Sequence, residues 1–233
     1  LQSEGVIPHG VKYQICMGTP LAITYLFVAP VARKEFVVIY TKHLAEEIQR
    51  IMAELPNNRI AYQWDVCIEV LMWEASLDQS PHPDYKMEIP ASLCGLSGLI
   101  PTAVDLGYHL CYGSPGDEHM IQPKDATKMV EIANAISVGA ARDINYIHMP
   151  VPHDRNDEAY FAPLKGLELQ TVTDLYLGCV HHGDHEGNKH KVELASKYVE
   201  VAAVGAECGL SRGDPALFDN ILHQHRELAG ESH

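Results

Sequence analysis

Two features are missing from this chain, and each absence excludes a class of protein. No apolar stretch approaches the ~20 residues that a membrane-spanning helix needs, so we expect no segment within a membrane. No basic cluster is present either, because the 17 Lys and Arg residues are scattered and outnumbered by 31 Asp and Glu. The resulting formal net charge of −14 repels phosphate backbones and anionic lipid, so neither nucleic acid nor a membrane surface is an expected partner.

The start of the chain and its cysteines indicate where the protein works. The first residues lack the basic segment and long apolar run of a signal peptide. Six cysteines, at positions 16, 67, 94, 111, 179 and 208, lack the close spacing of a small secreted domain. We therefore expect reduced thiols and a cytoplasmic location. Because the chain has no initiating Met, we also expect its true N-terminus to precede Leu1.

Strand-like and helix-like segments alternate along the 233 residues. The apolar patterns predict strands at residues 11–18, 59–67, 106–113, 143–149, 174–181 and 201–208. Helical periodicity and start signals predict helices at 35–55, 123–136, 188–200 and 216–229, with a shorter one between residues 90 and 105. Such alternation is typical of a parallel α/β sheet, and the length fits one domain, residues 1–233.

Reactive residues recur at the ends of the predicted strands, which favours a (β/α)₈ TIM barrel, where function gathers at the C-terminal strand ends. Only six strand-helix units are visible, so we expect two more before Leu1. An open, doubly wound sheet would explain six strands without missing units. The chain has no phosphate-binding glycine fingerprint, which leaves that alternative little other support.

His109 and Cys111 form a candidate metal half-site. Alternate residues of a strand face the same side, so both can reach one ion while Leu110 faces away. Imidazole and thiolate suit zinc better than calcium or magnesium. Cys208, at the end of the last predicted strand, would add a second thiolate and leave a fourth position open. The alternative is that all three are structural, buried residues.

The same residues carry a resemblance to a family. His109-Leu-Cys111, followed by Glu207-Cys208-Gly209-Leu210, resembles the C-terminal barrel of cobalamin-independent methionine synthase, in the superfamily it shares with uroporphyrinogen decarboxylase. The resemblance runs from the Gln63-Trp64-Asp65 strand to Arg212 and indicates a distant branch. It implies a TIM barrel with a zinc held by His, Cys, Glu and Cys, which binds a thiol substrate as thiolate for methyl transfer.

The resemblance also implies further site residues. Three of the zinc ligands are matched by His109, Cys111 and Cys208. His148 stands where the glutamate ligand is expected. It is either the fourth ligand or a hydrogen-bonding core residue, and in the second case solvent would complete the site. Asp65, with Gln63 beside it, matches the aspartate that holds a substrate ammonium; capping of the next segment is the alternative. The proton-handling histidine falls at His181 or His182.

Three functions remain open at this point. The first is a zinc-dependent methyltransferase of methionine biosynthesis, with a small-molecule thiol and a methyl donor as partners. The second is a metal-dependent lyase or hydrolase acting on a small organic acid or natural product. The third is a non-catalytic zinc-binding barrel. The sequence is compatible with a homo-oligomer but does not fix the oligomeric state.

Overall fold

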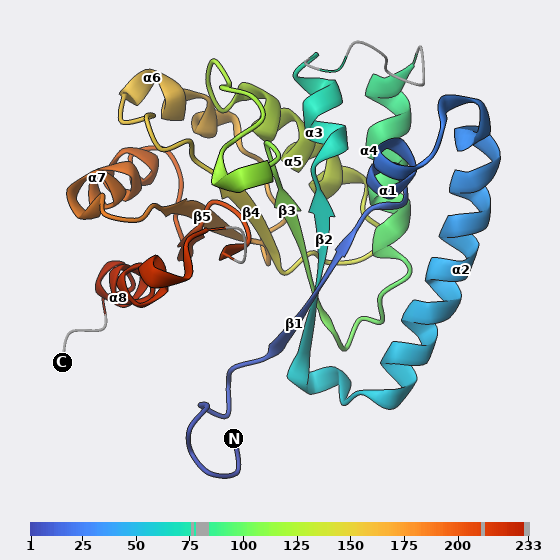
Figure 1. Ribbon diagram of the computed structural model, residues 1–233, viewed down its shortest axis with the longest axis horizontal. Helices are drawn as coiled ribbons and strands as arrows, with labels where there is room; N and C mark the ends of the chain where they lie inside the picture. The colour runs from blue at the N-terminus through green and yellow to red at the C-terminus, as the bar shows by residue number, and fades with distance from the viewer. Residues whose placement is uncertain (76, 78–83, 211–212, 231–233) are drawn as a thin grey trace.

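The fold is built on one sheet of six parallel strands. The structure, a computed structural model, describes residues 1–75, 77, 84–210 and 213–230. The strands are β1 (Tyr13–Gly18), β2 (Ile60–Val66), β3 (Asp105–Leu110), β4 (Tyr146–Pro150), β5 (Asp174–Val180) and β6 (Ala203–Ala206). They pair in sequence order, β1 to β6, and the sheet curls into a half-barrel (Figure 1).

The sequential strand order confirms the barrel-like part of the prediction. A doubly wound sheet would reverse its strand order at a switch point, and no reversal occurs. Within the described residues the sheet ends at β1 on one side and at β6 on the other, so it forms six strands of a barrel wall and not a closed eight-stranded barrel.

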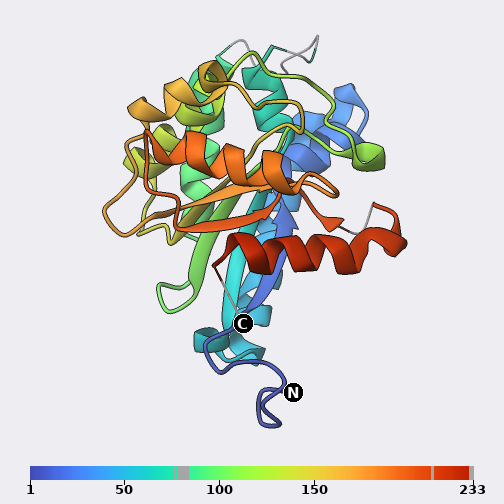
Figure 2. The same cartoon turned by 90° about the vertical axis from the view of Figure 1, so that its left-hand side faces the viewer.

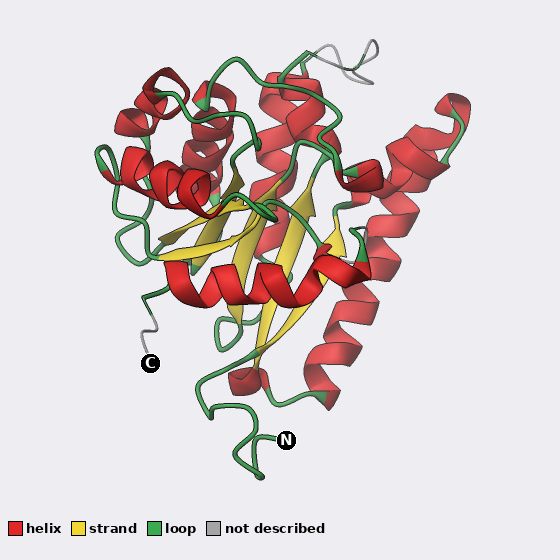
Figure 3. Ribbon diagram, turned by 60° about the vertical axis from the view of Figure 1, so that its left-hand side comes forward, coloured by secondary structure: helices red, strands yellow, loops and turns green. Residues whose placement is uncertain are grey.

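Helices connect the strands and cover the sheet (Figure 3). They are α1 (Pro20–Phe27), α2 (Arg33–Glu54), α3 (Ile68–Trp73), α4 (Tyr85–Ser97), α5 (Thr127–Gly139), α6 (Glu158–Phe161), α7 (His185–Ser196) and α8 (Phe218–Leu228). α1 and α2 lie at the β1 end, and α7 and α8 lie together at the β6 end (Figures 1 and 2). None of the described helices is both long and apolar enough to cross a membrane.

Strand β2 shows how the sequence divides the two faces of the sheet. Tyr62 and Trp64 are fully buried against the helices, whereas the alternate residues Gln63 and Asp65 are only partly buried on the inner face. The alternation of apolar and polar residues thus sends the aromatic rings into the core and leaves the polar groups for the concave side. Every predicted candidate residue of β2 lies on that inner face.

Three helices were not predicted: α1, α3 and the four-residue α6. Residues 20–27 form α1 because Thr19 accepts a hydrogen bond from the Ala22 N–H and Pro20 occupies the first turn. Its side chains are apolar nearly all round, so no helical period is visible in the sequence. The six-residue α3 is entirely buried and too short for periodicity to show.

Candidate functional site

The structure brings together three residues that the sequence singled out as metal ligands. His109 lies near the end of β3, Cys111 follows that strand, and Cys208 follows β6. Their ligand atoms all lie within 4.8 Å of one another, although Cys111 and Cys208 are 97 residues apart in the sequence. We call these three residues the thiol cluster. It forms because parallel strands deliver their C-terminal ends to one rim of the curled sheet.

The backbone holds Cys111 in place. Its N–H donates to the carbonyl of Val66 at 2.9 Å, which continues the pairing of β3 with β2 past the last strand residue. The N–H of Gly113 donates to Cys111 Sγ at 3.3 Å. Gly113 has a φ of 72°, a left-handed conformation that favours glycine, and this turn directs its N–H back to the sulfur. The sulfur is therefore oriented and stabilised by a main-chain donor.

The two thiols are neutral in the absence of a cation. The hydrogen bond with Cys208 lowers the pKa of Cys111, but a hydrogen bond with Cys67 and burial outweigh it and the pKa stands at about 12. The pKa of Cys208 rises to about 11, mainly because of its hydrogen bond with Cys111 and because of burial. Cys67, which the sequence analysis did not consider for this site, is therefore a neighbour of the cluster. A positive charge is what would turn these thiols into thiolates.

The geometry and the donor set fit zinc. The sulfurs of Cys111 and Cys208 are 3.6 Å apart, and two sulfurs each ~2.3 Å from a tetrahedral zinc would lie about 3.8 Å apart. His109 Nε2 is buried and has no nitrogen or oxygen partner among the described residues, and its imidazole interacts with the Cys208 thiol. One imidazole and two cysteines are donors that zinc prefers. A metal ion would satisfy all three side chains together.

His148 lies beside the thiol cluster and is not part of the group of three. It pairs in register with His109 on the neighbouring strand, and the Nδ1 atoms of the two imidazoles are 2.6 Å apart. Burial, together with the charge on a protonated His109, holds the pKa of His148 well below its usual value. The predicted role of His148 as a ligand therefore stays a prediction, and its observed contact is with another ligand candidate.

Gln63 and Asp65 form a hydrogen-bonded network on the inner face of β1 and β2. Gln63 Nε2 donates to Asp65 Oδ1 at 2.8 Å, and Gln14 Nε2 donates to Gln63 Oε1 at 2.8 Å and to the Tyr146 hydroxyl at 2.6 Å. We call Gln14, Gln63, Asp65 and Tyr146 the β1–β2 network. Asp65 pairs in register with His109, so the network and the thiol cluster are neighbours. Cys67 occupies the N-cap position of α3 without a side-chain capping bond, and the alternative role of Asp65 in capping that segment stays a prediction.

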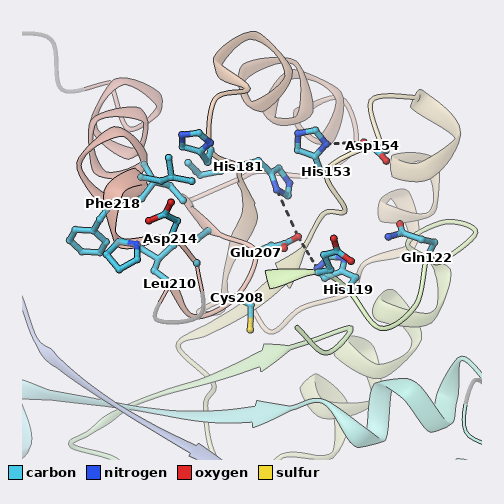
Figure 4. A pocket seen from close by; sticks show the side chains of 18 residues that line it. His119, Gln122, His153, Asp154, His181, Glu207, Cys208, Leu210, Asp214 and Phe218 are labelled. Atoms are coloured by element: carbon cyan, nitrogen blue, oxygen red, sulfur yellow. Dashed lines mark hydrogen bonds and ion pairs between the residues drawn. The ribbon is translucent and has the colours of Figure 1, made fainter. Parts of the chain in front are cut away.

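A cavity of about 790 Å³ adjoins the thiol cluster at Cys208 (Figure 4). His181 and His182 both line it, but His181 is buried and His182 is exposed. His181 Nε2 donates to the carbonyl of Val151 at 2.8 Å, which leaves Nδ1 facing Glu207 Oε2 at 3.8 Å. Burial lowers the pKa of His181 to about 4, although the Glu207 carboxylate opposes this shift. His181 is thus neutral at pH 7 with its acceptor nitrogen turned toward Glu207.

Two further residues of the cavity were missed by the sequence analysis. His119 Nε2 lies 2.8 Å from Glu207 Oε2, and its side chain is only 2% exposed. Glu207 therefore stands between His119 and His181, as the dashed lines in Figure 4 show. Glu207 was visible in the sequence as the residue before Cys208, but His119 lies in a loop with no spacing signal. Arg212, where the predicted resemblance ends, lies outside the described residues.

Acidic and apolar side chains dominate the rest of the cavity wall. Glu118, Asp154 and Asp214 add three carboxylates to that of Glu207, and no lysine or arginine belongs to the described part of the lining. Leu210, Phe218 and other apolar residues line the side of the cavity near α8, where Asp214 also lies (Figure 4). The described part of the wall is therefore suited to a small, partly apolar molecule.

Comparison with solved structures agrees with the fold. No protein-family model and no curated protein matches the sequence. A B12-independent methionine synthase from Shewanella sp. W3-18-1, in complex with selenomethionine, is similar with a TM-score of 0.63 at 13% identity, over 94% of this chain and 62% of that one. A putative vitamin-B12 independent methionine synthase from Listeria monocytogenes has a TM-score of 0.58 at 14% identity, over 99% and 67%. This chain thus spans about two thirds of the length of these enzymes, and at such identity they show that it shares their fold.

Proposed function

We propose that this protein is a zinc-dependent methyltransferase that activates a thiol substrate for methyl transfer. The observation that carries the proposal is the thiol cluster at the C-terminal rim of the sheet, in which His109 and Cys111 are buried and Cys208 is partly buried. The shared fold with B12-independent methionine synthases supports it. His109, Cys111 and Cys208 would hold the zinc, which when bound lowers the pKa of a thiol so that thiolate exists at neutral pH.

The β1–β2 network would orient the thiol substrate. Asp65 lies next to His109 in the register of β2 and β3, and Gln63 fixes one of its carboxylate oxygens. A carboxylate in this position would bind an ammonium group on the substrate by a charge-assisted hydrogen bond. This role favours an amino-acid thiol such as homocysteine over a simple alkyl thiol.

His181 would handle the proton of the thiol. Because its pKa is about 4, the imidazole is neutral at pH 7 and takes up a proton before it can give one. The hydrogen bond from Nε2 to Val151 leaves Nδ1 as the accepting atom. Glu207, 3.8 Å from that nitrogen, would stabilise the imidazolium that results. The proton can then return to a leaving group.

The cavity limits the methyl donor. Its four carboxylates would repel a polyanionic donor such as a polyglutamylated folate, whereas its apolar wall would accept a small neutral or cationic one. The proposed donor is therefore a small molecule that is not a polyanion, bound beside Cys208.

X-ray absorption at the zinc K-edge, with and without homocysteine, tests the proposal. Zinc with two sulfur neighbours that gains a third when homocysteine is added is the expected result. Zinc whose neighbours do not change would favour the lyase or hydrolase alternative, or a non-catalytic barrel. Absence of zinc from protein purified or reconstituted with it would remove the metal centre.

A further inference from the structure

His148 occupies a position that gives both of its ring nitrogens a neighbour. Nδ1 lies 2.6 Å from His109 Nδ1, a separation that requires a proton between the two nitrogens. Nε2 points the other way, toward β5 and β6. A Cβ atom at Gly178 would lie 2.8 Å from Nε2, and one at Gly205 would lie 3.4 Å away. The glycine at 178 thus makes room for the imidazole between the strands.

The backbone determines which nitrogen of His148 carries the proton. His148 makes a hydrogen bond with the backbone of Ala206 that favours the protonated imidazole. The acceptor in this bond is therefore the Ala206 carbonyl, and His148 is the donor. The nitrogen that donates to Ala206 is Nε2, because Nε2 is the end of the ring that faces β6. A neutral imidazole has only one N–H, so His148 Nδ1 is an acceptor. His109 Nδ1 must then be the donor in the 2.6 Å contact.

This chain of hydrogen bonds fixes the state of His109. With its proton on Nδ1, His109 keeps the lone pair on Nε2, a buried atom whose neighbour in the cluster is the Cys208 thiol. A histidine that binds a metal through one nitrogen typically donates the other N–H to a fixed acceptor. Here the acceptor is a second histidine from the neighbouring strand, which is itself anchored to β6, the strand that leads to Cys208.

We infer that His148 is a positioning residue for His109, and that the metal centre has three protein ligands, His109, Cys111 and Cys208, with an open fourth position. The inference rests on the proposed function for the presence of the metal. His148 would then support the metal through a hydrogen bond to His109 and would not be a fourth ligand. Neither of its nitrogens is available for coordination unless one of its two contacts, with His109 or with Ala206, is broken. The open position is where a substrate thiol would enter.

Nitrogen-15 NMR of the histidine side chains in the metal-free protein tests the hydrogen-bond chain directly. His109 is expected to be protonated at Nδ1 and His148 at Nε2. The opposite tautomer of His109 would overturn the inference. This measurement needs no zinc, thiol or methyl donor, so a failure of the proposed function leaves its result readable.

Substitution of His148 separates positioning from coordination. His148→Gln can still accept from His109 Nδ1 and donate to Ala206, so zinc affinity should stay within a few-fold of the parent protein. His148→Ala should weaken zinc binding by about 10- to 100-fold, the usual effect of losing such a partner. Absorption spectra of the zinc-loaded parent should fit one imidazole and two sulfurs. Two imidazoles in that fit, or equal zinc loss in the Gln and Ala variants, would show that His148 is a ligand.

Discussion

The β1–β2 network and the thiol cluster lie side by side on the inner face of the sheet, yet their polar atoms are satisfied in different ways. In the network, amide, hydroxyl and carboxylate groups bind one another at 2.6 to 2.8 Å. In the cluster, His109 Nε2 is buried with no nitrogen or oxygen partner among the described residues, and both cysteines have raised pKa values, about 12 for Cys111 and about 11 for Cys208.

The difference separates a region that is complete from one that needs a ligand. The side chains of Gln63 and Asp65 need no bound ligand to satisfy their polar atoms, since each is already hydrogen-bonded within the chain. His109, Cys111 and Cys208 gain most from a cation, which would accept one lone pair and two thiolate charges. Substitutions in the cluster should therefore affect metal binding, and substitutions in the network should affect only what the metal centre binds.

The largest effect is expected for Cys208→Ser. Loss of a thiolate ligand should lower zinc affinity by more than about 100-fold, measured by competition with a chelator. Cys16→Ser is the matched control, because Cys16 contacts the network through Gln63 and lies outside the cluster. Cys94→Ser, on helix α4, is a second control. Similar zinc retention in all three variants would contradict the assignment of the ligands.

A smaller effect is expected for His181→Gln. The variant should keep its zinc but methylate homocysteine about 100-fold more slowly, because it lacks the proton acceptor. Methyl iodide can serve as the methyl donor in this assay. His182→Gln is the control, since His182 lines the same cavity but is exposed. An equal loss of rate in both variants would remove the specific role of His181.

Within the network, Asp65→Asn should weaken binding of homocysteine about 10-fold, the loss of one charge-assisted hydrogen bond. Zinc content should not change. Titration calorimetry of the zinc-loaded protein can compare homocysteine with 4-mercaptobutyrate, which has the same chain without the amino group. The variant should bind 4-mercaptobutyrate as the parent does. If both thiols lose affinity equally, Asp65 does not bind the ammonium.

The sequence predicts the parts of this site that depend on strand periodicity. His109 and Cys111 face one side because they are two residues apart on a strand, and Cys208 joins them because parallel strands end at one rim. The order of the strands follows from the same alternation of elements. These features are local patterns or general consequences of the fold, so they are readable without coordinates.

Other contacts could not be predicted from the sequence, because they join side chains from segments that are far apart along the chain. The pairing of His119 with Glu207 joins a loop after β3 to the end of β6, and nothing in the spacing of either residue signals it. The contact of Cys67 with Cys111 has the same character. The His148 ring fits where it does because residue 178, on another strand, is glycine. Nothing in the sequence distinguishes this glycine from the other 16 of the 17.

The smallest effect is expected for a buried acid that, unlike the groups of the network, has a carboxylate oxygen without a hydrogen bond among the described residues. Glu69, in α3 just after β2, is 1% exposed. Thr19 donates a hydrogen bond to its Oε1, but Oε2 is buried without a partner among the described residues. Burial raises the pKa of Glu69 from an ordinary value of 4.5 to about 7, although the bond from Thr19 opposes the shift.

The sign of its pH effect follows from that shift. Between pH 4.5 and about 7 the folded state holds a proton that the unfolded state has lost, so stability should fall as pH rises through this range. The full cost in folding free energy, about 3 kcal/mol for such a shift, applies above pH 7.

Glu69→Gln removes this cost but leaves a buried amide N–H that costs about 1 to 3 kcal/mol. The variant should therefore gain about 1 kcal/mol relative to the parent protein at pH 8 and lose a similar amount at pH 5. Urea unfolding at both pH values measures this, with the exposed Glu186→Gln as control; an equal change at pH 5 and pH 8 would show that Glu69 does not titrate in this range.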